Sequence, residues 1–294
     1  MTVPSYQLHL GAHRTGTTAL QQFLARSGDS LSRAGIGFWG PAIWRSEGLK
    51  GFTAHYAAGE DREGVLQAAR SALAPHLGAA RGMKTVLISD ENLIGAMRRN
   101  YAEGALYSDA ADRLAGLRAV LPAPPRSIFF TIREFSGYWQ SVYAHLALRG
   151  IVRKFEGSRL VSSPGNSWLP VLGAIRRVFP HSQLRVLRYG PDCVDKGIAM
   201  MTGGPAGLAL PDVPKGVNRS LPEPALRELA ALPPGPAREA AIAGHRRDAP
   251  PPEPRFLPDE ARRLDEIFAQ DLQRLAEGAV PGAVLDPNGT EVPG

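Results

Sequence analysis

A short run of small residues, hydroxyls and one arginine lies near the start of the chain. Residues 7–10 alternate polar and apolar and predict a short strand, and residues 11–18 read Gly-Ala-His-Arg-Thr-Gly-Thr-Thr. Leu20, Phe23 and Leu24 then recur at helical spacing. A helix N-terminus leaves backbone N–H groups unpaired and carries a partial positive charge, and glycine lets a ligand approach the backbone closely. The order strand, loop, helix therefore predicts an anion site.

The side chains of this loop suit an anionic ligand. Thr15, Thr17 and Thr18 can donate hydroxyl hydrogen bonds, and Arg14 can contact a tetrahedral oxyanion through two parallel N–H groups. We therefore predict a phosphate or sulfate site. The loop departs from the nucleoside-triphosphate pattern, which has Lys and then Ser or Thr after its second glycine, because Gly16 is followed by two threonines. An ordinary strand–helix turn remains the alternative interpretation.

Three more segments predict strands, and segments with helical periodicity separate them. Residues 84–89 and 127–132 are continuous apolar runs typical of strands buried on both faces, and residues 183–189 predict a fourth strand. Helical spacing occurs over residues 63–77, 111–120, 135–148 and 168–179. Strands that alternate with helices predict an α/β fold with a central parallel sheet flanked by helices.

Two carboxylates and an arginine stand at the ends of these predicted strands. Asp90 and Glu91 follow residues 84–89, and open α/β sheets bind their ligands at the carboxyl ends of strands. Arg133 ends residues 127–132, and Ser141 lies eight residues on, about two helical turns into the next helix. If that junction folds back, Arg133 and Ser141 can reach one anion. The alternatives are a helix-capping role for Glu91, and a pairing of Arg133 with a nearby carboxylate.

Together these places resemble the sulfotransferases that use 3′-phosphoadenosine 5′-phosphosulfate (PAPS). That family shows Lys/Arg-Thr/Ser-Gly-Thr-Thr after its first strand, and its carbohydrate-modifying members continue with Leu-Gln, as Leu20 and Gln21 do. Its strand-ending Arg is followed by a helical Ser-x-Tyr, which Ser141 matches here, although the proline after the family's Arg is absent. The resemblance covers most of the chain loosely and is specific over residues 8–24 and 129–143.

The resemblance implies a fold, a cofactor and residues that bind it. The fold is a P-loop-NTPase-like, three-layer α/β fold, and PAPS is the sulfuryl donor, with no metal required. Arg133 and Ser141 would bind the 3′-phosphate of the cofactor. The remaining cofactor-binding residues would hold the 5′-phosphosulfate, and these are His13, Arg14, Thr15, Gly16, Thr17 and Thr18.

The resemblance also implies catalytic roles. Arg14 would stabilise the leaving phosphate, where many family members use Lys. The general base of the family is a Glu or His near the loop or after an early strand, and Glu91 has the best position for it. His55, Glu47 and His13 remain alternatives for the base, since each carries a suitable group in the early part of the chain.

These features predict a bacterial carbohydrate sulfotransferase that acts on a hydroxyl or amine of a small-molecule or oligosaccharide acceptor. The first alternative is an atypical P-loop kinase or NTPase, which the missing Gly-Lys-Ser/Thr disfavours. The second is a non-catalytic PAPS-fold nucleotide-binding protein. It stays open because an arginine replaces the lysine and because there are several candidates for the base. The sequence does not identify the acceptor or the oligomeric state.

Length, composition and net charge limit the classes of protein to which this chain can belong. The 294 residues are 44% hydrophobic and carry a net charge of +6, which suits one sulfotransferase-like domain over 1–294 with an anionic cofactor, although a solvated basic surface is the commoner cause. No lysine-rich arm predicts nucleic-acid binding, and the single cysteine, Cys193, excludes an internal disulfide. With no apolar run of membrane-spanning length and no signal-peptide pattern in residues 1–10, we expect a cytoplasmic protein without membrane insertion.

Glycine and proline mark the irregular parts. We predict irregular structure over 41–60, a flexible Pro-rich excursion over 233–256 and a tail over 278–294, with a helix over 258–277 before it. The stretch 216–221 contains Asn-x-Ser, which resembles a segment found after the fourth strand in related sulfotransferases.

Overall fold

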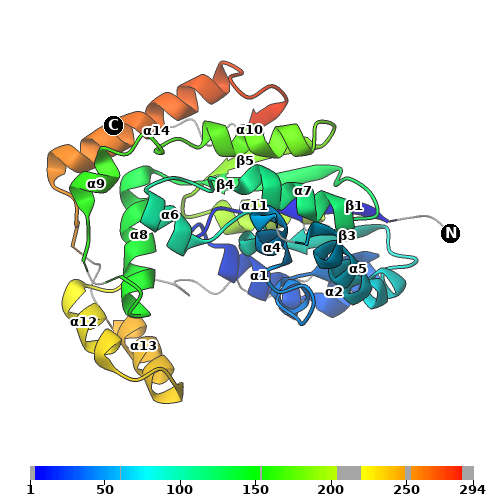
Figure 1. Ribbon diagram of the computed structural model, residues 1–294, viewed down its shortest axis with the longest axis horizontal. Helices are drawn as coiled ribbons and strands as arrows, with labels where there is room; N and C mark the ends of the chain where they lie inside the picture. The colour runs from blue at the N-terminus through cyan, green and yellow to red at the C-terminus, as the bar shows by residue number, and fades with distance from the viewer. Residues whose placement is uncertain (1–3, 60, 153, 204–219, 249–252, 287–294) are drawn as a thin grey trace.

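The predicted strands form and pair in parallel. The computed structural model describes residues 4–59, 61–152, 154–203, 220–248 and 253–286. Its six-stranded sheet has the order β2-β3-β1-β4-β5-β6 (Figure 1). The strands are β1 (Ser5–His9), β2 (Ile36–Trp39), β3 (Thr85–Ser89), β4 (Ser127–Ile132), β5 (Gln183–Arg188) and β6 (Ala283–Leu285). The prediction of an α/β fold with a central parallel sheet flanked by helices is confirmed.

The strand order reverses at β1. From β1 the chain runs to the edge strand β2, returns through β3 to one side of β1, and then crosses to β4 on the other side. His9 at the end of β1 is in register with Ser89 of β3 and with Phe129 of β4. Open α/β sheets bind ligands in the crevice that such a reversal leaves at the carboxyl ends of the strands. The segments that follow β1, β3 and β4 therefore meet at this edge.

Helices cover both faces of the sheet and complete three layers. On one face, α1 (Thr17–Arg26), α2 (Gly28–Arg33) and α11 (Cys193–Thr202) pack on Leu87, Phe129 and Leu187. On the other face, Leu8, Ile88 and Phe130 belong to the larger core. The main helices of that core are α5 (Arg62–Ala79), α7 (Ala110–Val120), α8 (Phe135–Leu148), α10 (Leu169–Val178) and α14 (Pro258–Ala276).

An aromatic cluster anchors the start of α8. Trp168 stacks on Phe135 with ring centroids 5.9 Å apart and meets Tyr138 edge-on at 5.3 Å. Its indole N–H donates to the carbonyl oxygen of Arg133 at 2.8 Å. Because Trp168 is fully buried, this bond fixes the backbone of Arg133 where β4 turns into α8.

Residues 41–60 differ from the prediction of irregular structure. They contain α3 (Pro41–Trp44) and α4 (Phe52–Ala58). Gly51 and Gly59 flank α4 with φ angles of 75° and 85°, so these two glycines cap a helix where the sequence suggested an irregular chain. Helices α2, α11, α6 (Met97–Glu103) and α9 (Gly157–Val161) and the short 3-10 turn Glu91–Leu93 were not predicted either.

The last third also holds more regular structure than its composition predicts. The excursion predicted over 233–256 contains α13 (Pro236–Asp248), which projects from the body with α12 (Glu223–Ala231) (Figure 1). Pro236 occupies the first helical position, where a missing N–H costs nothing. The tail predicted over 278–294 contains β6, which extends the sheet beside β5. Residues 249–252 and 287–294 lie outside the described residues.

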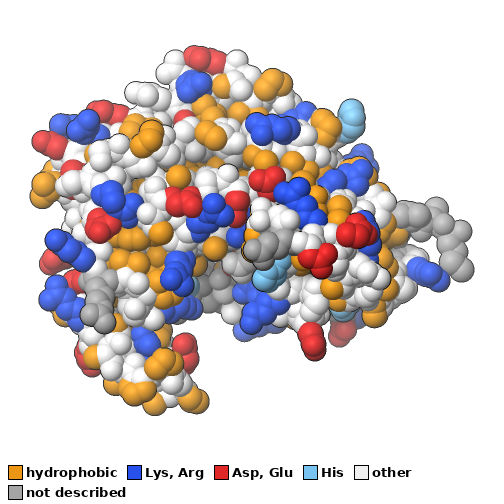
Figure 2. Space-filling view, in the orientation of Figure 1, with side chains coloured by type: hydrophobic (Ala, Val, Ile, Leu, Met, Phe, Trp, Pro, Cys, Tyr) orange, Lys and Arg blue, Asp and Glu red, His pale blue; other side chains and the backbone are white. Residues whose placement is uncertain are grey.

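The surface carries charges of both signs. On the face drawn in Figure 2, Lys and Arg side chains are interspersed with Asp and Glu. No helix within the described ranges is both long enough and apolar enough to span a bilayer.

Candidate functional site

The loop after β1 is shaped by left-handed backbone. Leu10 and Ala12 donate their N–H groups to Phe129 and Thr131 of β4, each at 3.1 Å, so the loop first extends β1. Arg14 and Gly16 then take φ angles of 68° and 84°. A Cβ on Gly16 would lie 2.7 Å from a methyl carbon of Val194 in α11, which only glycine avoids.

The N-terminus of α1 opens onto this loop. Gly16 has no side chain that could cap the helix, so the first N–H groups of α1 point out of the turn without a side-chain acceptor from that residue. Thr15 donates to the carbonyl oxygen of Ala12 at 2.5 Å and closes the turn. Thr17 is buried and Thr18 half-buried. The start of α1 is therefore open toward the loop, and an anion site there stays a prediction.

Arg14, Arg133 and Ser141 come together beside the loop. Nε of Arg14 donates to Oγ of Ser141 at 2.9 Å, and Nη1 of Arg133 donates to the carbonyl oxygen of Arg14 at 2.9 Å. Nη1 of Arg14 also lies 3.4 Å from Nδ1 of His145, one turn beyond Ser141. The loop after β1 and the β4–α8 junction therefore form one cluster, which we call the arginine side of the loop.

Arg133 also has the carboxylate partner that the alternative interpretation named. Its Nε lies 3.2 Å from Oε1 of Glu134, and its guanidinium lies over the ring of Tyr189 at 4.5 Å. Ser220, the last residue of the predicted Asn-x-Ser, has its Oγ 3.4 Å from Oγ of Ser141. Asn218 of that motif lies outside the described residues.

The other side of the loop is a buried polar network at the end of β3, which we call the carboxylate side. Glu91 accepts from Nε2 of Gln21 at 2.8 Å and from Arg45 at 3.1 Å. Burial by itself raises the pKa of Glu91, but His13, Arg45 and Gln21 outweigh it and hold the pKa below its ordinary value. Glu91 is therefore ionised at neutral pH.

Two buried histidines complete the carboxylate side. Gln21 donates to Oγ of Ser89 at 3.3 Å, and the same hydroxyl is hydrogen-bonded to Nδ1 of His9 at 2.8 Å. Burial lowers the pKa of His9 to about 4 against the opposing charge of Glu91. Burial likewise lowers the pKa of His13. Both imidazoles are neutral at neutral pH.

His13 is engaged through both ring nitrogens. The hydroxyl of Tyr107 accepts from the His13 backbone N–H at 2.8 Å and lies 2.7 Å from its Nδ1. Oδ1 of Asn92, 3.2 Å from Nε2, can only accept, so the neutral ring carries its proton on Nε2 and its Nδ1 accepts from Tyr107. His13 holds the loop to the segments around Asn92 and Tyr107, which is a structural use of the side chain.

The remaining candidates for the base lie apart from both sides of the loop. His55 is exposed on α4, which packs against α5 and α7, and Glu47 is exposed between α3 and α4. Within the described residues, neither side chain bonds to the loop or to Glu91. Of the proposed site residues, His55 is the one that the structure does not bring to the cluster.

Sequence reasoning missed Arg45, Tyr107 and His145. Arg45 lies in the stretch taken as irregular, and Tyr107 lies between predicted elements, so neither had a place in the fold. Gln21 did carry a signal, because it is a polar residue on the apolar side of α1 between Leu20 and Phe23 and is 6% exposed. A buried glutamine in such a stripe indicates a polar partner.

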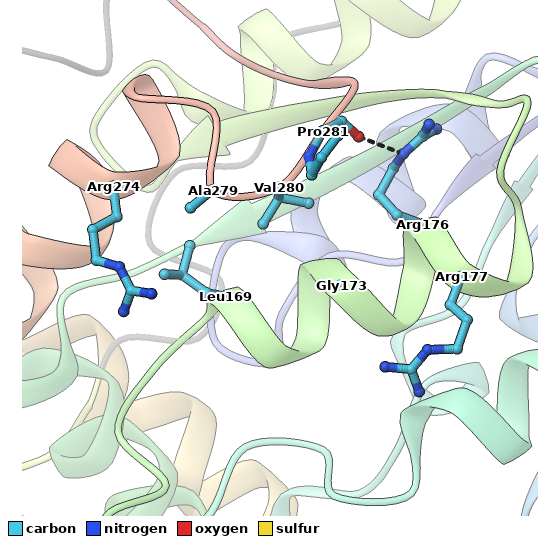
Figure 3. Close-up of a pocket in the computed structure, with 8 residues that line it drawn as sticks. All are labelled: Leu169, Gly173, Arg176, Arg177, Arg274, Ala279, Val280 and Pro281. Atoms are coloured by element: carbon cyan, nitrogen blue, oxygen red, sulfur yellow. Dashed lines mark hydrogen bonds between the residues drawn. The ribbon is translucent and has the colours of Figure 1, made fainter.

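A pocket of about 380 Å³ lies elsewhere, between α10 and the segment that leads to β6 (Figure 3). Figure 3 shows Arg176 reaching the carbonyl oxygen of Pro281, at 2.9 Å, and the same guanidinium also binds the carbonyl oxygens of Pro180 and Ser182. Arg176 therefore anchors the connection to β6. The pocket shares no residue with either side of the loop.

Within the described residues, no three His, Cys, Asp or Glu side chains form a group that could hold a metal ion. Comparison of the chain with protein-family models, with curated proteins and with solved structures finds no match.

Proposed function

We propose that this protein is a PAPS-dependent sulfotransferase with a P-loop-like fold, which transfers a sulfuryl group to a hydroxyl or amine of a carbohydrate acceptor. One observation carries the proposal: two segments more than 100 residues apart, each predicted to bind a phosphate of PAPS, meet within hydrogen-bond distance. Arg14 bonds to Ser141 across 127 positions, and Arg133 bonds to Arg14 across 119. The choice of a carbohydrate rests on the resemblance through Leu20 and Gln21.

The geometry supports a division of roles. The backbone N–H groups of the loop and of the start of α1, with Arg14 and the hydroxyls of Thr17 and Thr18, would bind the 5′-phosphosulfate, and Arg133 and Ser141 would bind the 3′-phosphate, whereas the Thr15 hydroxyl closes the turn. In the reaction, the acceptor oxygen forms a bond to sulfur while the bond from sulfur to the 5′-phosphate oxygen breaks. The electron pair of that bond leaves on the phosphate, next to Arg14, and the acceptor proton goes to Glu91.

A kinase or NTPase would need a different use of the same edge. Its loop would hold a lysine against the phosphates, and an acid would hold Mg²⁺. Asp90 ends the strand beside β1, but both of its oxygens accept from Arg45, and Oδ1 also accepts from the N–H of Asn92 at 2.8 Å. These bonds hold the carboxylate against Arg45, so a metal ion would have to compete with the guanidinium for it.

Calorimetric titration with adenosine 3′,5′-bisphosphate, adenosine 5′-phosphate and magnesium-ATP tests the proposal. We expect the bisphosphate to bind most tightly, because Arg133 and Ser141 add contacts to its 3′-phosphate. Arg133→Ala should weaken that binding by about ten- to a hundredfold, the range for a hydrogen bond to a charged group. Arg126→Ala removes an exposed arginine just before β4 and should leave the affinity unchanged.

The other outcomes separate the alternatives. Preference for magnesium-ATP would replace the proposal with a kinase or NTPase. If the protein binds the bisphosphate tightly but does not convert PAPS to it, the protein is the non-catalytic nucleotide-binding protein. An unchanged affinity in Arg133→Ala would remove that residue from the site.

A further inference from the structure

Arg45 joins the two carboxylates that follow β3. Its Nε donates to Oδ2 of Asp90 at 2.8 Å, and its Nη2 donates to Oδ1 of Asp90 at 3.0 Å and to Oε1 of Glu91 at 3.1 Å. The side chain of Arg45 is 43% exposed, whereas that of Glu91 is 12% exposed. One half-exposed guanidinium therefore fixes two buried acids.

The Glu91 carboxylate is held from both ends. Arg45 binds one oxygen and Gln21 binds the other, at 2.8 Å. The backbone N–H of Glu91 also donates to this carboxylate, which has about four acceptor positions in all, so at least one remains. Glu91 thus has a defined orientation and can still accept a proton.

Arg45 is the permanent positive charge at this carboxylate. The groups that face Glu91 are Arg45 from the segment after α3, Asp90 from its own strand end, His9 and His13 from β1 and its loop, and Tyr107. Burial lowers the pKa of both histidines, so their rings are neutral at neutral pH, and His13 lowers the pKa of Glu91 only where its own ring is protonated. The same guanidinium also binds Asp90, so the two acids share one positive charge.

We propose that Arg45 is a positioning residue for sulfuryl transfer, which keeps the Glu91 carboxylate ionised and oriented so that it can take the acceptor proton. The inference rests on the proposed function, because Arg45 acts through the base assigned there. Burial opposes the charged form of Glu91. Without Arg45 the carboxyl group would hold its own proton to higher pH, and a protonated carboxyl group cannot serve as a base.

Two measurements on the full chain test this role. The first is a carboxyl-carbon NMR titration of protein labelled at glutamate Cδ, in which the spectrum of Glu91→Gln identifies the Glu91 resonance. Arg45→Gln should raise the titration midpoint of Glu91, and Arg45→Lys, which keeps a charge but loses the fork, should fall between Arg45→Gln and the wild type. Arg99→Gln is the matched control, because Arg99 is 48% exposed and bridges Glu103 and Asp109 elsewhere.

The second measurement is the pH profile of kcat/KM for release of adenosine 3′,5′-bisphosphate from PAPS. The acid limb should move to higher pH in Arg45→Gln, with a larger loss of turnover at low pH than at high pH. Arg45→Lys provides the same comparison if the glutamine variant does not fold. An unmoved Glu91 midpoint, or a moved midpoint with an unmoved acid limb, would overturn the positioning role. Failure of the proposed function shows separately, as absence of bisphosphate binding by the wild-type protein.

Discussion

The two sides of the loop after β1 use charge in opposite ways. On the arginine side, Arg14 donates to the Ser141 hydroxyl, Arg133 donates to the carbonyl oxygen of residue 14, and one acid, Glu134, pairs with Arg133 at 3.2 Å. On the carboxylate side, Arg45 binds two acids directly, at 2.8 and 3.1 Å. The first arrangement sets two guanidinium groups against one carboxylate beside a helix N-terminus, whereas the second sets one guanidinium group against two carboxylates.

The two sides of the loop also differ in burial, and the carboxylate side is the more buried. On the carboxylate side, His9, His13, Asp90 and Glu91 are each no more than 9% exposed, and hydrogen bonds connect them to one another or to shared partners. Satisfied buried polar networks are rigid and specify one arrangement. On the arginine side, the side chain of Arg133 is 17% exposed. The comparison indicates that the loop is held in place from β3 and presents its charge toward β4.

The largest effect is expected for Arg14→Ala, on the arginine side of the loop. If the arginine side stabilises the charge that leaves with the phosphate, the variant should lose about 10²- to 10³-fold in kcat for PAPS turnover. The folded state should change little, because alanine meets the same left-handed backbone as arginine at φ 68°. Arg26→Ala, an exposed basic residue in the last turn of α1, is the control. Normal turnover in Arg14→Ala would remove it from the reaction.

The carboxylate side can be tested through pH. His9 has a folded pKa of about 4 against an ordinary value of 6.5, so the unfolded chain binds more protons between these values. Stability should therefore fall as the pH drops from 6.5 toward 4, by up to about 3 kcal/mol from this group. His9→Asn, whose amide can replace the ring nitrogen that faces Ser89, should remove that part of the loss.

Denaturant unfolding at pH values above 6.5 and near 4 measures the effect, and the difference between variant and wild type isolates His9 from other acid-titrating groups. The exposed His181 gives a matched control, since His181→Asn should follow the wild-type curve. Parallel curves for His9→Asn and the wild type would mean that the buried imidazole does not resist protonation. The carboxylate side would then not be a rigid network that excludes a charged imidazole.

The sequence predicts the residues of the arginine side better than those of the carboxylate side. The loop and α8 are contiguous patterns, and the helix predicted over 135–148 has those bounds in the structure. Ser141 could be placed because its spacing from Arg133 is local. Arg45 and Tyr107 could not, since their partners Asp90 and His13 lie 45 and 94 positions away, and periodicity carries no information on such pairs.

The errors in the fold have similar causes. Gly51 and Gly59 predict irregular chain because a capping glycine and a loop glycine cannot be distinguished without knowledge of the helix between them. The strand β6 has three residues, too few to show a period of two, and it follows a Gly/Pro-rich stretch. Its place beside β5 comes from the sheet edge that was available to it, which is a tertiary property.

The smallest effect is expected for a variant of Ser141, on the arginine side of the loop. Ser141→Ala removes the hydroxyl that accepts from Arg14 at 2.9 Å, but the charge of Arg14 and Arg133 remains. We therefore expect a loss of about 0.5–1.5 kcal/mol in bisphosphate binding, or roughly two- to tenfold in Kd, well below that for Arg133→Ala. Ser136→Ala, in the same helix but bonded to Asp265 of α14, is the calorimetric control and should bind as the wild type does. A loss as large as that of Arg133→Ala would instead mean that Ser141 orients Arg14, so that hydroxyl and guanidinium act as one unit.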